Sequence, residues 1–232
     1  MADGKAKNKI GVSAAPTDIL VPSEEQIRPD PRRVRTRYAI ILAGRKLFGE
    51  HHPDGVGIDE LIAAARISRQ SFYNHFPDKE ALAREILHDI RITLQQLIRQ
   101  ANAEQPDPAR RVATAMCIYA HRATTDLTEG RLIARLPLGD IATESAVNSG
   151  VLADVRDGLA KGRLAVLTPA VGVAFIIGTT QSLISQILMD GNSSMAVVTT
   201  QQFVTLVLRA FGLPPIEAEI IASEAVDRVF RR

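Results

Sequence analysis

Apolar residues in this chain recur at intervals of three and four, and this spacing limits the possible folds more than any other feature. Within residues 58–65 the apolar positions follow i, i+3, i+4 and i+7: Ile58, Leu61, Ile62 and Ala65. Patterns typical of strands are nearly absent, and prolines and glycines separate the periodic segments. We therefore expect an all-α fold. The expected helices cover residues 34–50, 58–65, 69–76, about 78–103, 109–125, 170–189, 194–211 and 216–230, with several short helices in 128–165.

The composition is that of a globular protein. The chain has 232 residues, of which 46% are hydrophobic, which is ample for a packed core. A single cysteine, Cys117, excludes an internal disulfide and a multi-cysteine zinc site, and this fits a reducing cytoplasm. Residues 1–30 contain no apolar stretch long enough for a signal peptide, so we expect a polar, flexible arm and a cytoplasmic location.

One segment requires a test for membrane insertion. Residues 164–189 carry no charge and are long enough to span a bilayer. Pro169 near its start and the polar run of residues 179–182 argue against a span. We expect a helix buried in protein and no membrane partner.

Basic residues gather before and within the first expected helix. Between Arg28 and Lys46 seven basic side chains face a single acidic one, Asp30, on a chain whose net charge is only +2. Such a segment indicates a surface that binds a polyanion, although solvated basic termini are also common.

The segment ISRQSFYNHFPDKEAL, residues 67–82, gathers aromatic and hydrogen-bonding side chains in a chain with 4% aromatic residues. Ser68 can cap a short helix, on which Phe72 and Phe76 point inward at i and i+4. The outward face is then polar. A short polar helix that follows a helix and a turn matches a helix-turn-helix reading the major groove, while a solvated helix in any bundle has the same pattern.

The stretch from residue 33 to about 85 resembles the DNA-binding domain of TetR-type transcriptional regulators. The resemblance lies in ILAGRKLF, in RIS at the turn, and above all in SFYNHFPDKEAL. It implies an arm (1–30), a helix-turn-helix domain (31–80) and a larger helical domain (81–232) that binds a small molecule and dimerises. It also implies a double-stranded DNA operator as partner.

The resemblance assigns roles to particular residues. The base-facing positions are Arg69, Gln70, Ser71 and Asn74. The positions that approach phosphates are Tyr73, His75 and Lys79, although His75 can equally be an ordinary surface histidine. The basic segment before the first helix would follow phosphates or enter the minor groove as an extended strand, with Arg28, Arg32, Arg33, Arg35 and Arg37.

The chain departs from the family pattern in its turn. Arg66 stands where the family usually has glycine, and a residue with a side chain at positive φ costs about 1 kcal/mol. Ile62 replaces a usual alanine, and Val56 and Gly57 stand where a capping Ser or Thr is common. These changes concern how the domain docks on DNA.

Two broad apolar helices, 170–189 and 194–211, carry more hydrophobic surface than one small domain hides. We expect them to pair with their copies in a two-fold four-helix interface; the alternative is a monomer core.

Catalytic motifs are missing, so we expect a protein that is not an enzyme and has no cofactor and no metal site. Tyr119, His121 and Arg122 form a polar group that either lines an effector cavity or makes surface ion pairs with Asp126. Asp140 and Glu144 either hold a metal or face solvent.

The sequence thus predicts a DNA-binding homodimer, a repressor that a small apolar effector releases from a palindromic operator. The alternative is a constitutive or architectural DNA-binding protein without an effector.

Overall fold

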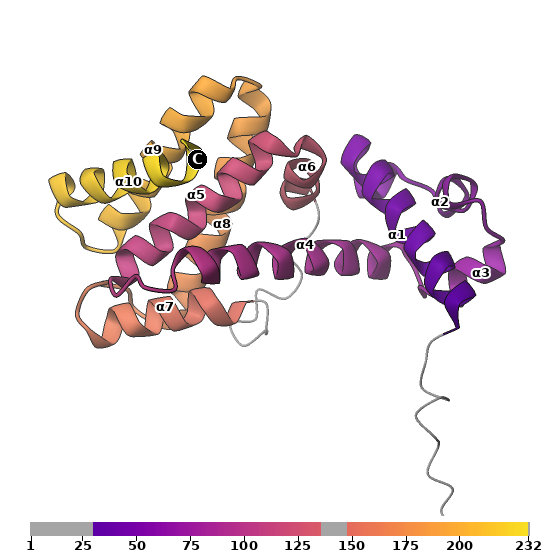
Figure 1. The fold of residues 1–232 in the computed structure, drawn as a ribbon, viewed down its shortest axis with the longest axis horizontal. Helices are drawn as coiled ribbons and strands as arrows, with labels where there is room; N and C mark the ends of the chain where they lie inside the picture. Colours follow the sequence, from indigo (N-terminus) through magenta and orange to yellow (C-terminus); the bar gives the residue numbers. More distant parts are fainter. Residues whose placement is uncertain (1–29, 136–147, 232) are drawn as a thin grey trace, which may run out of the picture.

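The structure, a computed structural model, describes residues 30–135 and 148–231, and their regular elements are all helices (Figure 1). The prediction of an all-α fold is confirmed. The helices are α1 (Pro31–Glu50), the 3-10 turn η2 (Pro53–Gly55), α2 (Ile58–Ala65), α3 (Arg69–Tyr73), α4 (Lys79–Ala101), α5 (Pro108–Thr125), α6 (Leu127–Arg135), α7 (Ser149–Ala160), α8 (Pro169–Asp190), α9 (Ser193–Ala210) and α10 (Pro215–Phe230). The short helices expected in 128–165 are α6 and α7, and Asp140 and Glu144 lie outside the described residues.

Helix α1 begins earlier than the sequence analysis predicted. Asp30 caps it by accepting a hydrogen bond from the backbone N of Arg32 at 2.9 Å, and Pro31 occupies the first helical position. The prediction that Arg32, Arg33, Arg35 and Arg37 precede the first helix in an extended strand is therefore wrong. These four side chains stand on the first two turns of α1, and Arg28 lies outside the described residues.

Two hydrophobic clusters build the molecule. The first joins α1, α2, α3 and the first four turns of α4 to one buried residue each of α5 and α8 and two of α6. The second lies among α5, α7, α8, α9 and α10. Helix α4 runs from one group of helices to the other (Figure 1), so it links the N-terminal three helices to the rest of the fold.

Helix α6 holds the N-terminal helices from a second side. It packs against α1 so closely that a Cβ on Gly49 would lie 2.9 Å from a methyl carbon of Thr128. Arg135 donates to the carbonyl of Gly49 at 2.9 Å. The junction between the two groups therefore has two supports, α4 and α6.

Helix α8 is the one helix within the described ranges that is long and apolar enough to cross a membrane. It packs against α5, α6, α7 and α9. Its buried residues include Val173, Leu183 and Ile184, while Val171, Phe175 and Met189 are exposed. The helix is thus a wall of the domain core with an apolar outer face.

Candidate functional site

Helix α3 is fixed by contacts at its start and on its inner face. The hydroxyl of Ser68 accepts from the backbone N of Ser71 at 3.1 Å, which confirms the predicted cap. Phe72 and Phe76 are buried, with ring centroids 6.2 Å apart. Pro77 follows and Asp78 caps α4, accepting from Ala81 N at 2.6 Å. The short helix is therefore held rigidly on its aromatic side.

The outer face of α3 presents hydrogen-bonding groups to solvent. Arg69, Gln70 and Asn74 are exposed, and Ser71 is half-buried. The amide of Gln70 donates to Oδ1 of Asn74 at 3.1 Å, and Arg69 makes an ion pair with Asp59 of α2. These side chains bond to neighbouring side chains at the surface, so a DNA base edge would have to replace only weak, exposed contacts.

The residues that the resemblance assigns to phosphates differ in how free they are. Tyr73 and Arg35 are exposed. All three hydrogens of the Lys79 ammonium point to backbone carbonyls, those of Pro53 at 2.9 Å, Asp54 at 3.2 Å and Val56 at 3.0 Å. Lys79 is thus an anchor of the turn before α2, and a phosphate contact would replace one of these bonds.

Arg37 is the most constrained member of the basic segment. It forms an ion pair with Glu85 of α4, and its Nη1 donates to the carbonyl of His75 at 3.3 Å. Its guanidinium also lies 4.6 Å from the ring centroid of Phe76. Arg37 therefore ties α1 to α4 and to the end of the α3 segment.

Burial, with Arg33 and Arg37 nearby, lowers the pKa of His75. The imidazole of His75 is therefore neutral at pH 7 in the free protein.

The turn between α2 and α3 keeps the geometry that glycine would favour. Arg66 has φ 55°, the only positive φ on a residue with a side chain in the described ranges. Its backbone N donates to the carbonyl of Ala63 and that of Ile67 to the carbonyl of Ile62, both at 3.2 Å. The turn is therefore not reshaped, and the strain at Arg66 is tolerated. At the start of α2, Glu60 accepts from Gly57 N at 2.8 Å, and Gly57 itself has no side chain to cap the helix.

A cavity of about 80 Å³ lies among α4, α5, α7 and α8. Most of its lining is apolar, and its polar members include Arg91, Gln95, Tyr119, Asp154 and Thr180. A second lobe of about 50 Å³ shares Arg91, Tyr119 and Thr180 with it. Apolar walls with a few polar groups are typical of small-molecule sites.

The polar groups of this cavity are held by partners. Arg91 bonds to the amide oxygen of Asn148. Burial raises the pKa of the Tyr119 hydroxyl, against the opposing charge of Arg91, so the phenol is neutral and can donate. Burial also raises the pKa of Asp154, which Arg111 opposes through a 2.5 Å bond from its Nε.

The three predicted effector residues do not share one cavity. Tyr119 lines the cavity just described, whereas His121 and Arg122 line another on a different side of α5. Arg122 Nε donates to Glu129 at 2.5 Å, and its Nη2 lies 3.9 Å from Asp126. The ion pair with Asp126 is the alternative that the sequence analysis gave to an effector cavity.

Sequence reasoning missed Arg91, Gln95 and Thr180. Arg91 and Gln95 stand at i and i+4 on α4, beside the buried Ile90 and Leu94, and that spacing was the available signal. Thr180 belongs to the polar run that argued against a membrane span.

The helix-turn-helix with an exposed polar α3 and the helical domain with a cavity define the class: a DNA-binding transcriptional regulator. Two family models match the chain, "Bacterial regulatory proteins, tetR family" over residues 40–86 and "Tetracyclin repressor-like, C-terminal domain" over residues 107–224. The chain belongs to the TetR family, as its sequence motifs predicted.

Individual relatives agree with this assignment. The chain is 33% identical over 82 residues to the HTH-type transcriptional repressor DhaR of Mycobacterium sp. (strain GP1), a match that covers 34% of this chain and 41% of that repressor. The crystal structure of RolR with resorcinol is similar with a TM-score of 0.59 and 26% identity, over 83% of this chain and 95% of RolR. A putative TetR family regulator from Shewanella sp. PV-4 has a TM-score of 0.65 at 14% identity, over 77% of this chain and 99% of that one, and shows the shared fold.

Proposed function

We propose that the protein is a cytoplasmic, homodimeric repressor that a small, mostly apolar effector releases from a palindromic operator. The main support for this proposal is the path of α4 through the molecule. Its start packs behind α3 in the first hydrophobic cluster, and Arg91 and Gln95 further along it line the cavity. A helix of 23 residues spans about 35 Å, so one rigid element joins the reading surface to the effector cavity.

The DNA contact rests on the outer face of α3. Arg69 can bond guanine with two donors, and Gln70 or Asn74 can do the same with adenine. Ser71 and Tyr73 extend this surface, which is flanked by Arg35 of α1, by His75 in the turn after α3 and by Lys79 at the start of α4. Base contacts then supply specificity, and the basic first turns of α1 supply affinity that falls with salt.

Dimerisation is supported by the outer face of α8 and α9. Exposed large apolar side chains on these two helices are Val171, Phe175, Met189, Met195, Val198 and Leu206. A soluble monomer rarely exposes so many together, and pairing with a second copy would bury them. Two recognition helices about one DNA turn apart would then read a palindrome. A Leu206→Arg variant that still sediments as a dimer would contradict this interface.

The effector proposal rests on the cavity around Tyr119 and Arg91. The crystal structure of RolR contains resorcinol, a single ring with two hydroxyls. The cavity here offers apolar walls for a ring and the neutral Tyr119 hydroxyl, Gln95 and Thr180 for hydroxyl groups. Its present volume of about 80 Å³ is less than a cavity that holds benzene, so binding requires the walls to move apart. Movement of α4 would carry α3 with it.

The test uses an operator obtained by selection from random duplexes. Fluorescence anisotropy of that duplex is measured while a panel of single-ring phenols, resorcinol included, is added. We expect at least one phenol to raise the melting temperature of the protein and to lower its operator affinity. Tyr119→Phe should weaken both effects, whereas Tyr38→Phe, on the exposed face of α1, should leave them unchanged. If no phenol has both effects, the constitutive alternative is favoured.

A further inference from the structure

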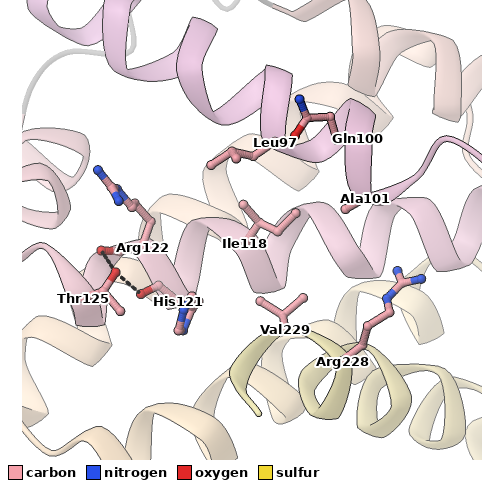
Figure 2. A pocket seen from close by; sticks show the side chains of 9 residues that line it. All are labelled: Leu97, Gln100, Ala101, Ile118, His121, Arg122, Thr125, Arg228 and Val229. Carbon is pink, nitrogen blue, oxygen red and sulfur yellow. Dashed lines mark hydrogen bonds between the residues drawn. The ribbon is translucent and has the colours of Figure 1, made fainter. Parts of the chain in front are cut away.

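A second, larger cavity of about 470 Å³ lies between α4, α5 and α10 (Figure 2). It shares no lining residue with the cavity around Tyr119, because it uses other faces of α4 and α5. Figure 2 shows Ile118 of α5 between Leu97 of α4 and Val229 of α10. With Ala101 these side chains form an apolar middle section.

All the charged side chains that line this cavity are basic. Arg122 and Arg228 lie at opposite ends of it in Figure 2, and its other polar members are Gln100, His121 and Thr125. The lining contains no carboxylate. An apolar section between two cations fits a ligand that carries negative charge on an apolar body.

Arg228 is the cation that lacks a counterion. Its Nη2 donates to the hydroxyl of Thr114, and none of the ion pairs within residues 30–135 and 148–231 includes it, although it is half-buried. Other arginines nearby are paired: Arg231 with Asp227 at 3.1 Å, and Arg110 with Glu224. A half-buried charge without a counterion is costly even when a neutral hydroxyl bonds to it, so an anion beside Arg228 would be stabilised.

The end of the cavity at Arg122 is less available to an anionic ligand. Arg122 already bonds to Glu129, and the ring of His121 makes an edge contact with Phe230, centroid to centroid 5.1 Å. The Nδ1 atom of His121 is buried and has no hydrogen-bond partner among the described residues. An imidazole held by one ring contact can turn to meet a ligand, whereas Arg228 supplies the unpaired charge.

We propose that this cavity binds a small amphipathic carboxylate, with the carboxylate on the guanidinium of Arg228 and the apolar body against Leu97, Ile118 and Val229. The site goes beyond the proposed function, because it is separate from the cavity around Tyr119. Guanidinium and carboxylate match in geometry and can form two parallel hydrogen bonds.

The test is calorimetric titration of the full-length protein, without DNA, with 2-naphthoate and with the uncharged 2-naphthamide. We expect the acid to bind at least about tenfold more tightly than the amide. Arg228→Gln keeps a donor for Thr114 but removes the charge, and it should lower the affinity for 2-naphthoate by at least about tenfold while the affinity for the amide stays unchanged. Arg231→Gln, three residues further along the chain, is the matched control and should have no effect.

Ala101→Phe provides a second variant, because a ring at the exposed end of α4 would fill the cavity and should abolish binding of both compounds. Equal affinities for acid and amide, or unchanged binding of 2-naphthoate to both variants, would overturn the proposal. Loss of 2-naphthoate binding in Tyr119→Phe but not in Arg228→Gln would place the acid in the other cavity and overturn it as well. Because DNA is absent, this failure is distinguishable from a failure of the proposed function.

Discussion

The reading surface on α3 and the junction that joins α1 to the larger domain are built in different ways. On α3 the side-chain bonds connect residues within ten positions of one another: Gln70 with Asn74, Ser68 with Ser71, and Arg69 with Asp59 of α2. At the junction they connect residues far apart in the chain: Arg45 bonds to Glu129 at 2.7 Å across 84 positions, and Arg135 to Gly49 across 86. The reading surface is thus specified locally, whereas its orientation depends on distant residues.

This difference separates two kinds of effect. Substitutions on the exposed face of α3 should change DNA binding with little effect on folding. Substitutions at the junction, or on the inner face of α3, should lower the stability of the fold. They should weaken DNA binding only because less of the protein is folded.

The largest effect is expected at the inner face. Phe72 is fully buried, so Phe72→Ala should lower the free energy of unfolding by about 3–5 kcal/mol. Urea denaturation followed by circular dichroism measures this loss. Tyr73→Ala, at the exposed neighbouring position, removes only an edge contact with the Phe72 ring at 5.6 Å and should cost no more than about 1.5 kcal/mol. Similar losses in the two variants would show that α3 is not anchored on its aromatic side.

On the outer face, Arg69→Ala should weaken operator binding by about 1–3 kcal/mol and relax the base preference at one position in each half-site. The stability should be unchanged, since the ion pair with Asp59 is exposed. Anisotropy on operator variants measures both quantities. Arg131→Ala, an exposed arginine on α6, is the control; an equal loss there would mean that Arg69 contributes only charge.

At the junction, one carboxylate serves two arginines. Glu129 is bonded to Arg45 of α1 and to Arg122 of α5, and only 12% of its side chain is exposed. Glu129→Gln leaves Arg45 without a counterion and Arg122 with only the more distant Asp126, and it should lower stability by about 1–3 kcal/mol. Glu104→Gln, on an exposed loop, should leave the denaturation midpoint unchanged. If the two variants behave alike, α6 does not hold α1 through this carboxylate.

The smallest effect is expected at the turn, and it has the opposite sign. Arg66→Gly removes the cost of a side chain at φ 55° and should stabilise the protein by about 0.5–1 kcal/mol. Ala63→Gly, three residues earlier inside α2, should destabilise it by about 1 kcal/mol. Thermal unfolding of this pair tests the turn, because a loss of stability in Arg66→Gly would show that the arginine side chain makes a compensating contact.

The contrast also explains what the sequence could predict. The cap at Ser68 and the buried aromatic pair Phe72 and Phe76 follow from spacings of three to five residues, and the structure confirms them. The predicted end of this helix at Pro77 is wrong, because α3 ends at Tyr73 and Phe76 lies in the turn that follows. The early start of α1 was missed, although Asp30 followed by Pro31 is a recognisable cap.

The cavities could not be predicted in the same way. Tyr119 and His121 are two positions apart, which on a helix turns their side chains by about 200°, so they face different cavities. Which helix covers each face is decided by long-range packing. Glu129 was missed for the same reason, because nothing local to it indicates Arg45 as a partner.

The central claim is that α3 reads a DNA sequence. The most direct measurement is selection of bound sequences from random duplex DNA by the purified protein and by a variant with Arg69, Gln70 and Asn74 changed to alanine. We expect the parent protein to enrich a palindrome, and the folded variant to lose that enrichment while it keeps salt-sensitive general binding. Enrichment of the same palindrome by both proteins, or of no sequence by either, would contradict the claim.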